Sequence, residues 1–475
     1  MSKLHSQAMF FQARAAEKVA NPVLQRALLK AKPLFVGKRS KGIAALAEDQ
    51  LAFEQLRNAC VDIRNRVLSD LDVWLDIFET QAKATGAEVL WAKDGEEICD
   101  LVIDVARRHG VTKAAKSKSM LSEEAHLNEA LAAAGIQPVE TDLGEYIVQL
   151  AGETPSHIIA PAVHKTLDEI ADLFTKTHGR PRQTDIPAMT REAREVLRQH
   201  FLSAEMGISG ANFLIAETGS AALVTNEGNG RMVTTLPKVH VVITGIEKVV
   251  PTLEDFATLM RLLPRSATGQ TISNYVSLLT GTRQPGDAEG PEKTVFILVD
   301  NGRAKLLGSA YEEMLRCIRC GACMNHCPVY TRIGGHAYGT TYPGPIGKII
   351  SPHMLGLDAT KTMATASTLC GACGEVCPVK IPIPDLLMRL REESFSEPHA
   401  NPAMRGQGAG YSRLVTGIWQ AWAMVYRSPS LYKLATWLGS RFNWLTPSNQ
   451  GPWTSVRTPL KPAPKRLRDL LKERA

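Results

Sequence analysis

Seven of the nine cysteines in this 475-residue chain stand in two short runs, and each run ends in Cys-Pro. The first run reads C-x-x-C-x-x-C-x-x-x-C-P, the spacing by which a ferredoxin arm wraps a 4Fe-4S cube and sends its fourth thiolate to a second cluster. The second run ends in the same way. The runs predict electron transfer through two iron–sulfur clusters, and they comprise Cys317, Cys320, Cys323 and Cys327 before Pro328, then Cys370, Cys373 and Cys377 before Pro378.

The two predicted clusters have unequal numbers of thiolates. In the crossed ferredoxin arrangement, one cluster is held by Cys317, Cys320, Cys323 and Cys377, and the other by Cys327, Cys370 and Cys373. Ser367 stands three residues before Cys370, where a fourth cysteine would be in register. The second centre could be 3Fe-4S, could keep four irons with Ser367, water or a substrate on the fourth, or could take a ligand from another chain. The spacing does not choose among these outcomes.

Zinc and disulfides are the alternative uses of such cysteines. Zinc sites usually come as two C-x-x-C pairs, whereas a triplet followed by a fourth cysteine and proline is typical of iron–sulfur ligation. No signal peptide is expected at the N-terminus, and a chain of this length can bury a core without disulfides. Basic side chains near the thiolates are candidates for raising cluster potential, and they are Arg316, Arg319, His326, Arg332 and Lys348.

The formal charge of +7 gathers at the C-terminal end, where eleven Lys and Arg against two acids follow position 411. Five of the seven tryptophans lie there, namely Trp419, Trp422, Trp437, Trp444 and Trp453. No apolar run is long enough to span a bilayer, so any membrane contact would be peripheral. The alternative is a helical appendage packed on the iron–sulfur domain or a partner, because prolines interrupt any long amphipathic helix. Only charge suggests nucleic acid, and we expect no nucleic-acid binding.

Residues 1–78 are predicted to form a helical arm. Apolar residues recur at helical spacing, which makes Cys60 part of a buried stripe comprising Phe53, Leu56, Cys60, Ile63, Val67, Trp74 and Phe78. Cys99 lies in a second apolar helical segment and is also expected in the core. The basic residues Lys38, Arg39 and Lys41 predict a break within the arm.

Residues 79–300 alternate between short apolar runs and amphipathic stretches, which predicts an α/β domain with a mixed or parallel sheet. Helices are expected at 96–108, at 122–134 with Ser122 as N-cap, and around 253–263. The β-rich runs are 89–91, 136–139, 158–159, 213–215, 221–224, 239–244 and 295–299.

Two loops of this domain could hold an anion. Residues 216–220 contain Glu217 and Gly219 at the end of an apolar run, and open α/β sheets bind ligands at the carboxyl ends of strands. Glu217 is therefore the candidate catalytic residue, although an ordinary hairpin turn explains the same residues. The second loop, 268–274, is also rich in glycine and hydroxyl groups.

Four segments together resemble the lactate utilization protein B family, and the similarity covers essentially the whole chain. They are GISGANFLIAETGSAALVTNEGNGR, LPKVHVVITGIEKVVPTLED, CIRCGACMNHCPVY and LCGACGEVCPVKIPIPDLL. The resemblance implies an α/β lactate-utilisation domain (79–300) similar to the NagB, RpiA and CoA-transferase group. An α-helical ferredoxin domain (301–395) with two 4Fe-4S clusters and a basic, Trp-rich C-terminal region (396–475) follow it. The resemblance implies the same three-thiolate pattern for the second cluster, so it leaves the role of Ser367 open.

The resemblance further implies an iron–sulfur subunit that relays electrons from L-lactate oxidation to pyruvate towards a downstream carrier. Its expected partners are the other lactate-utilisation subunits and an electron acceptor. The expected location is the cytoplasm, with or without peripheral contact at the inner membrane face. No G-x-G-x-x-G fingerprint for a flavin or nicotinamide opens a helix after a strand. Three alternatives remain. The α/β domain could carry out the substrate chemistry at Glu217, the protein could be a scaffold whose α/β domain binds only protein, or it could transfer electrons from another 2-hydroxy acid such as glycolate.

Overall fold

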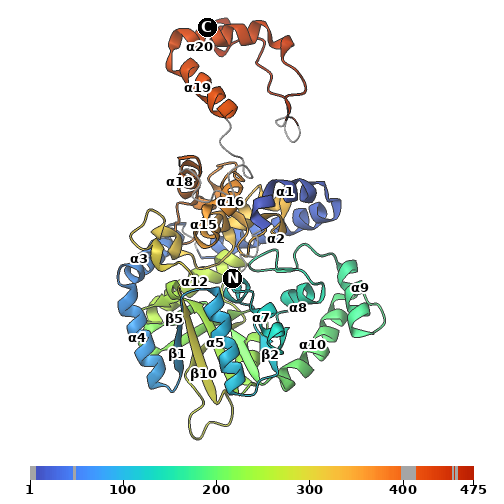
Figure 1. The fold of residues 1–475 in the computed structure, drawn as a ribbon, viewed down its shortest axis with the longest axis vertical. Helices are drawn as coiled ribbons and strands as arrows, with labels where there is room; N and C mark the ends of the chain where they lie inside the picture. Colours follow the sequence, from blue (N-terminus) through green and yellow to red (C-terminus); the bar gives the residue numbers. More distant parts are fainter. Residues whose placement is uncertain (1–6, 47–49, 397–412, 452–453, 455–457, 475) are drawn as a thin grey trace. The chain divides into compact units, whose positions relative to one another are not determined.

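The computed structural model describes residues 7–46, 50–396, 413–451, 454 and 458–474. The chain divides into two compact units, Met1–Pro402 and Ala403–Ala475. The first unit begins with a helical arm, as predicted, and Figure 1 shows it in blue. The arm consists of η1 (Gln7–Phe10), α1 (Phe11–Ala20), α2 (Pro22–Ala44), α3 (Gln50–Ser69) and α4 (Leu71–Ala84).

The predicted break at Lys38, Arg39 and Lys41 is wrong, because α2 runs without interruption to Ala44. Lys and Arg are good helix formers, so this short basic run carries no residue that ends a helix. Instead the run brings Arg39 to the second cysteine run, where its guanidinium donates to the Val376 carbonyl at 3.0 Å. Cys60 is fully buried, as the apolar stripe predicted, and Cys99 is 8% exposed.

The α/β region contains a six-stranded sheet in the order β1-β10-β7-β4-β2-β3, and every neighbouring pair is parallel. A second sheet has the order β8-β5-β6-β9 and mixes parallel and antiparallel pairs. The strands are β1 (Glu88–Ala92), β2 (Lys113–Lys116), β3 (Gln137–Glu140), β4 (Met206–Ser209), β5 (Phe213–Ile215), β6 (Ser220–Thr225), β7 (Val239–Gly245), β8 (Val249–Val250), β9 (Tyr275–Thr280) and β10 (Lys293–Val299).

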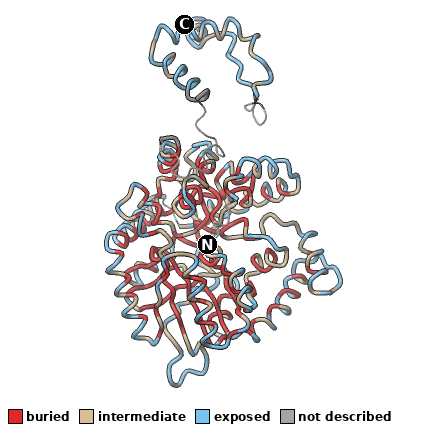
Figure 2. Tube along the Cα trace, in the orientation of Figure 1, coloured by how far each residue is buried: buried red, intermediate tan, exposed pale blue. Residues whose placement is uncertain are grey.

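Helices cover the six-stranded sheet, so its central strands are buried on both faces and read as continuous apolar runs (Figure 2). One face of β7 and β10 packs on α5, α6 and α7, and the other face packs on α4 and the second sheet. The helices of this region are α5 (Gly95–Arg108), α6 (Met120–Glu124), α7 (Leu127–Ala133), α8 (Leu143–Leu150), α9 (Leu167–His178), α10 (Ile186–Ser203), α11 (Asn229–Thr235) and α12 (Leu253–Ala267), with the 3-10 turns η2 (Ala216–Thr218) and η3 (Ile246–Lys248).

Two sequence predictions fail in this region. The single helix expected over 122–134 is two helices, because His126 adopts a left-handed conformation with φ of 54° and ends the first. Ser122 is not its N-cap: the cap of α6 is Ser119, whose hydroxyl accepts from the Ser122 amide. Residues 158–159 form no strand, and Ile158 packs instead in the core that surrounds the cysteines.

The iron–sulfur region is built from short helices and turns. They are η4 (Ala304–Leu306), η5 (Glu312–Arg316), α13 (Ala322–His326), α14 (Tyr330–Ile333), η6 (His336–Tyr338), α15 (Gly344–Leu355), α16 (Leu357–Ala364), α17 (Ala372–Glu375) and α18 (Ile383–Ser396). The second unit contains α19 (Arg413–Arg427), α20 (Pro429–Arg441), η8 (Asn443–Leu445) and α21 (Leu467–Arg474). Pro429 begins α20, so α19 and α20 are separate helices, as the prolines predicted; Trp453 lies outside the described residues.

Candidate iron–sulfur centre and an adjoining cavity

Four cysteines from the two runs line one small cavity: Cys317, Cys320, Cys323 and Cys377. The rest of the wall is mostly apolar and includes Ile318, Ile346 and Val379. Cys320, Cys323 and Cys377 are each less than 9% exposed. The fold thus brings together the four cysteines that the crossed ferredoxin pairing assigns to one cluster.

The electrostatics of these thiols fit a bound metal cluster. Burial and then the neighbouring thiols of Cys377 and Cys317 raise the pKa of Cys320 to about 12. Burial and then the adjacent Cys320, Cys317 and Cys377 likewise raise the pKa of Cys323. Four thiolates this close and this buried would repel one another unless cations lie between them. A soft, four-sulfur donor set of this kind suits iron–sulfur ligation.

The remaining three cysteines form a second, more open group. Cys327 is buried and Cys373 is half-buried. Burial is the main cause that raises the pKa of Cys373, and the neighbouring Cys327 thiol is the second. Cys370 is exposed, and a hydrogen bond from the Ala372 amide, followed by one from Thr368, lowers the pKa of its thiol. This second group therefore has a side that is accessible from the surface.

The backbone around Cys320 is repeated around Cys370, which supports the register that places Ser367 opposite Cys317. Arg319 and Leu369 directly precede Cys320 and Cys370, and both have positive φ, 59° and 54°. Gly321 and Gly371 follow with φ of 72° and 83°. Ser367 is half-buried, and its hydroxyl accepts from the Leu369 amide at 3.2 Å.

The predicted basic neighbours of the thiolates differ in burial and in their bonding partners. Lys348 is fully buried; burial lowers its pKa, and the nearby thiols of Cys327, Cys373 and Cys323 act in the opposite sense. Arg316 pairs with Glu313, a ring nitrogen of His326 bonds the Ala322 carbonyl, and Arg332 is exposed. Among these five side chains, Lys348 is the one whose charge interacts with both Cys327 and Cys373.

The helical arm supplies further cations that sequence reasoning missed. Arg57 of α3 donates to the carbonyls of Glu375 and Cys377 at 3.0 and 2.7 Å. Arg39 of α2 lies near the thiols of Cys320 and Cys377, which oppose the lowering of its pKa by burial. Both residues are far from the cysteines in the sequence, so no local pattern could have identified them.

Glu217 lies in a hairpin turn, and it lines neither the cysteine-lined cavity nor the larger cavity described below. Residues 216–219 join the antiparallel strands β5 and β6, and Glu217 is exposed. Its carboxylate accepts from the Leu253 amide at 2.9 Å, at the first turn of α12. Gly219 has φ of 62°, and a Cβ there would lie 2.2 Å from the Ala82 nitrogen, so glycine is needed where the turn meets α4.

Glu217→Ala should therefore lower the free energy of unfolding by about 1 kcal/mol, as loss of a helix cap does, and leave electron transfer unchanged. Glu254→Ala is a matched control, because Glu254 lies in the same turn of α12 and is exposed but does not accept this amide. Denaturant unfolding and cluster reduction measured on both variants check the prediction. A loss of electron transfer without loss of stability in Glu217→Ala would return Glu217 to a catalytic role.

A larger cavity of about 250 Å³ lies at the carboxyl ends of β2, β4 and β7. The loop at 268–274 contributes Thr268 and Ser273 to its wall, whereas Glu217 does not line it. Arg319 and Tyr342 of the iron–sulfur region complete the wall. The cavity therefore lies between the α/β sheet and the loop that carries Cys317 and Cys320.

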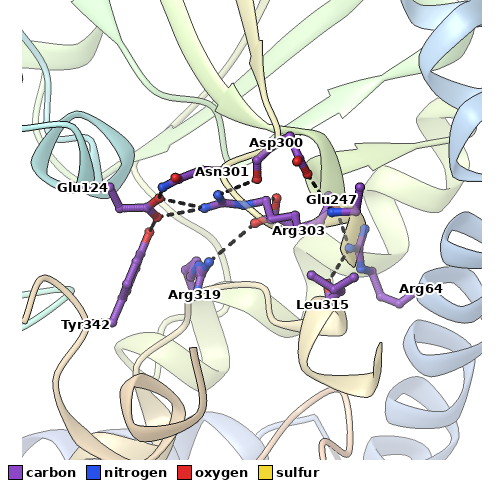
Figure 3. A network of polar contacts seen from close by, with 10 residues as sticks. Arg64, Glu124, Glu247, Asp300, Asn301, Arg303, Leu315, Arg319 and Tyr342 are labelled. Atoms are coloured by element: carbon purple, nitrogen blue, oxygen red, sulfur yellow. Dashed lines mark hydrogen bonds and ion pairs between the residues drawn. The ribbon is translucent and has the colours of Figure 1, made fainter. Parts of the chain in front are cut away.

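A buried polar network forms one side of this cavity (Figure 3). Arg303 lies 2.8 Å from carboxylate oxygens of both Glu124 and Glu247, and the three side chains are 7%, 0% and 3% exposed. Burial alone would raise the pKa of Glu247, but Arg303, then Lys248 and Arg319, lower it to about 2. Arg303 therefore pairs with two buried carboxylates and is the neighbour that most lowers the pKa of Glu247.

A further polar group lies where the α/β and iron–sulfur regions meet. Glu153, His164 and His336 have possible metal-ligand atoms within 4.8 Å of one another. Both ring nitrogens of His164 are already engaged, by Ser156 and Glu153 at 2.7 Å, and His336 bonds the Thr154 carbonyl at 2.6 Å. These bonds give the group a structural role in joining the two regions.

Three protein-family models match successive parts of the chain. Residues 75–299 match the LUD domain, residues 313–381 match a 4Fe-4S dicluster domain, and residues 389–475 match the C-terminal region of lactate utilisation protein B. The dicluster match covers every cysteine of the two runs.

Curated relatives resemble the chain over most of its length. A lactate utilization protein B of Bacillus velezensis is 40% identical, covering 98% of this chain and 97% of the relative. One of Bacillus subtilis is 39% identical, covering 98% and 96%. An uncharacterized electron transport protein of Escherichia coli is 43% identical over 80% of this chain and 79% of its own. This chain belongs to the lactate utilization protein B family.

Proposed function

We propose that this protein is an iron–sulfur electron-transfer subunit in the oxidation of L-lactate to pyruvate. The observation that carries the proposal is the convergence of four cysteines on one cavity in a chain of this family. Lactate oxidation releases two electrons, whereas an iron–sulfur cluster carries one at a time. The oxidation itself therefore needs a two-electron site, and this subunit relays the electrons to a downstream carrier.

We assign the first cluster to Cys317, Cys320, Cys323 and Cys377 and the second to Cys327, Cys370 and Cys373, with Ser367 in the fourth position. The shared cavity, and the raising of the pKa values of Cys320 and Cys323 by their neighbours Cys317 and Cys377 after burial, support the first assignment. The repeated backbone around Cys320 and Cys370 supports the place given to Ser367. Arg39, Arg57 and Lys348 surround these thiols with positive charge and stabilise the thiolate forms.

Reduction by substrate tests the function. Protein purified without oxygen and mixed with its partner subunits should give the EPR signals of reduced clusters after addition of L-lactate, and not with glycolate. Iron and sulfide analysis should show two clusters per chain. Clusters that are intact yet stay oxidised with L-lactate in the complete mixture would contradict the proposal. Preferential reduction by glycolate would assign the subunit to the other 2-hydroxy acid.

Ser367→Cys should alter only the second cluster, because it supplies the missing thiolate in register with Cys317. We expect the second centre to hold four irons more firmly and its EPR spectrum to change, while the spectrum of the first cluster stays the same. Thr365→Cys, two residues earlier and exposed, is the matched control and should change neither cluster. Unchanged iron content and spectra in Ser367→Cys would show that the register is wrong.

The proposed partners are the other lactate-utilisation subunits and the electron acceptor. We place the protein in the cytoplasm, with its C-terminal unit as the candidate surface for a peripheral membrane or partner contact. Trp419, Trp422, Trp437 and Trp444 are each at least 46% exposed, and such side chains suit a membrane interface. None of the helices in the described part of the chain has the length and apolar character needed to cross a bilayer.

A further inference from the structure

We propose that the cavity at the carboxyl ends of β2, β4 and β7 binds a small carboxylate with a hydroxyl or keto oxygen on its α-carbon, in contact with Arg319. Three parallel neighbouring strands end at this cavity, and the loops that follow them supply Lys118, Asn212 and Lys248. Open α/β sheets bind ligands in this position, because the loops after the strands converge there.

Three buried donors of the cavity wall have no hydrogen-bond partner among the described residues. They are Lys118 Nζ, Thr244 Oγ1 and Arg319 Nη1. Thr244 is only 2% exposed. A buried donor without an acceptor costs free energy, so three of them around one cavity indicate that a ligand supplies the acceptors. Two oxygens of a carboxylate and one on the α-carbon would match these donors in number.

The charge of the wall favours an anion. Lys118, Lys248, Arg303 and Arg319 face two acids, Asp142 and Glu247. Both acids are already engaged: Glu247 pairs with Arg303 at 2.8 Å, and Asp142 accepts from the Gly144 and Glu145 amides at the start of α8. Asp142, Glu145 and Glu227 lie near Lys118 and oppose the lowering of its pKa by burial, but none of the described residues accepts a hydrogen bond from its Nζ, which is left for the ligand.

The size and the apolar part of the wall narrow the class of anion. About 250 Å³ is below the usual range for drug-sized ligands and suits a metabolite of a few carbon atoms. Inorganic phosphate lacks the carbon chain that apolar side chains would contact. The apolar wall residues include Met120, Ile158, Ile159, Leu223 and Leu263.

Arg319 connects this cavity with the first cluster site. It lies between Cys317 and Cys320, and its guanidinium stacks 4.4 Å from the centre of the Tyr342 ring, with Nη2 3.5 Å from Glu247. A carboxylate at Arg319 Nη1 would change the charge one residue from Cys320 and two residues from Cys317, both proposed cluster ligands. Binding of the ligand should therefore change the spectrum of the first cluster. This effect on the cluster, unlike the binding itself, rests on the proposed electron-transfer function.

Binding of pyruvate, L-lactate, acetate and inorganic phosphate to the full chain tests the site, with clusters intact and oxygen excluded. Calorimetry should show that pyruvate or L-lactate binds more tightly than acetate or phosphate. Lys118→Gln should weaken that binding about tenfold or more, and the nearly isosteric Thr244→Val should weaken it several-fold. Lys305→Gln, at an exposed lysine outside the cavity wall, should bind as the unmodified protein does.

The EPR spectrum of the reduced protein gives a second readout. Pyruvate should shift the signal of the first cluster in the unmodified protein and not in Lys118→Gln, while iron content stays equal in both. Absence of acid binding to iron-replete protein, unchanged affinity in both variants, or tighter binding of phosphate would overturn the site. If Lys118→Gln does not fold, Thr244→Val decides the same question. Normal binding, with clusters that stay oxidised after addition of L-lactate to the complete mixture with the partner subunits, would instead contradict the proposed function.

Discussion

Cys317→Ser should remove the first cluster and leave the second. The fold places Cys317 in the wall of a cavity with three other cysteines, and serine is a much poorer iron ligand than thiolate. Iron content should fall by about half, and electron transfer from L-lactate should be lost. Iron and sulfide analysis with EPR of the reduced protein would show one cluster signal gone and the other retained.

Cys60→Ser is the matched control for this experiment. Cys60 lies in α3 of the helical arm and is fully buried. Its thiol donates to the Thr258 carbonyl of α12 at 3.8 Å, and it lies outside the cysteine-lined cavity. A serine there keeps the donor, so iron content and electron transfer should be unchanged. An equal loss of iron in both variants would show that any buried cysteine change destabilises the protein, and the cluster assignment would lose its support.

Arg303→Met should be the most damaging single change to stability outside the cysteines. It removes the cation between Glu124 and Glu247 and leaves two carboxylates almost completely buried without their partner. Removal of one partner from a buried ion pair typically costs about 3–5 kcal/mol. Thermal and denaturant unfolding followed by circular dichroism should show this loss.

Arg182→Met provides the surface counterpart. Arg182 also bridges two acids, Asp168 at 2.8 Å and Asp172 at 2.6 Å, but the acid side chains are 77% and 68% exposed. Water screens that pair, so the variant should unfold like the unmodified protein. Adding Glu124→Gln to Arg303→Met should recover part of the lost stability, because it removes one stranded charge. Equal stability losses in the two arginine variants would contradict the role given to burial.

The sequence predicted the long, mostly apolar strands β7 and β10 and missed β2, β4, β8 and β9. The run at 239–244 was recognised because both of its faces are covered. Strand β2 has the sequence KAAK, which gives no apolar signal, yet Lys116 is 1% exposed. Its ammonium lies 2.6 Å from the carboxylate of Glu140 on β3, and this ion pair makes burial possible. Only the tertiary structure supplies that partner.

The same distinction holds for the candidate site. Cysteine spacing is a local property, so the sequence could indicate which thiols gather. The cavity beside them joins Lys118, Thr244 and Arg319 from three separate segments, and no spacing rule relates these segments. Its clearest sequence signal was the hydroxyl-rich loop at 268–274, which contributes two residues to the wall. Glu217 attracted attention because its turn resembles a ligand loop, whereas its carboxylate caps a helix.

The hydrogen bond from Arg57 to the Cys377 carbonyl joins residues 320 positions apart and has a consequence for biogenesis. Proteins are made from the N-terminus, so α3 leaves the ribosome long before Cys377 exists. The wall of the first cluster cavity is incomplete until that cysteine has emerged and reached the helical arm. Loading of the first cluster with iron must therefore follow translation of nearly the whole iron–sulfur region, and until then the earlier thiols have to be kept reduced by the cell.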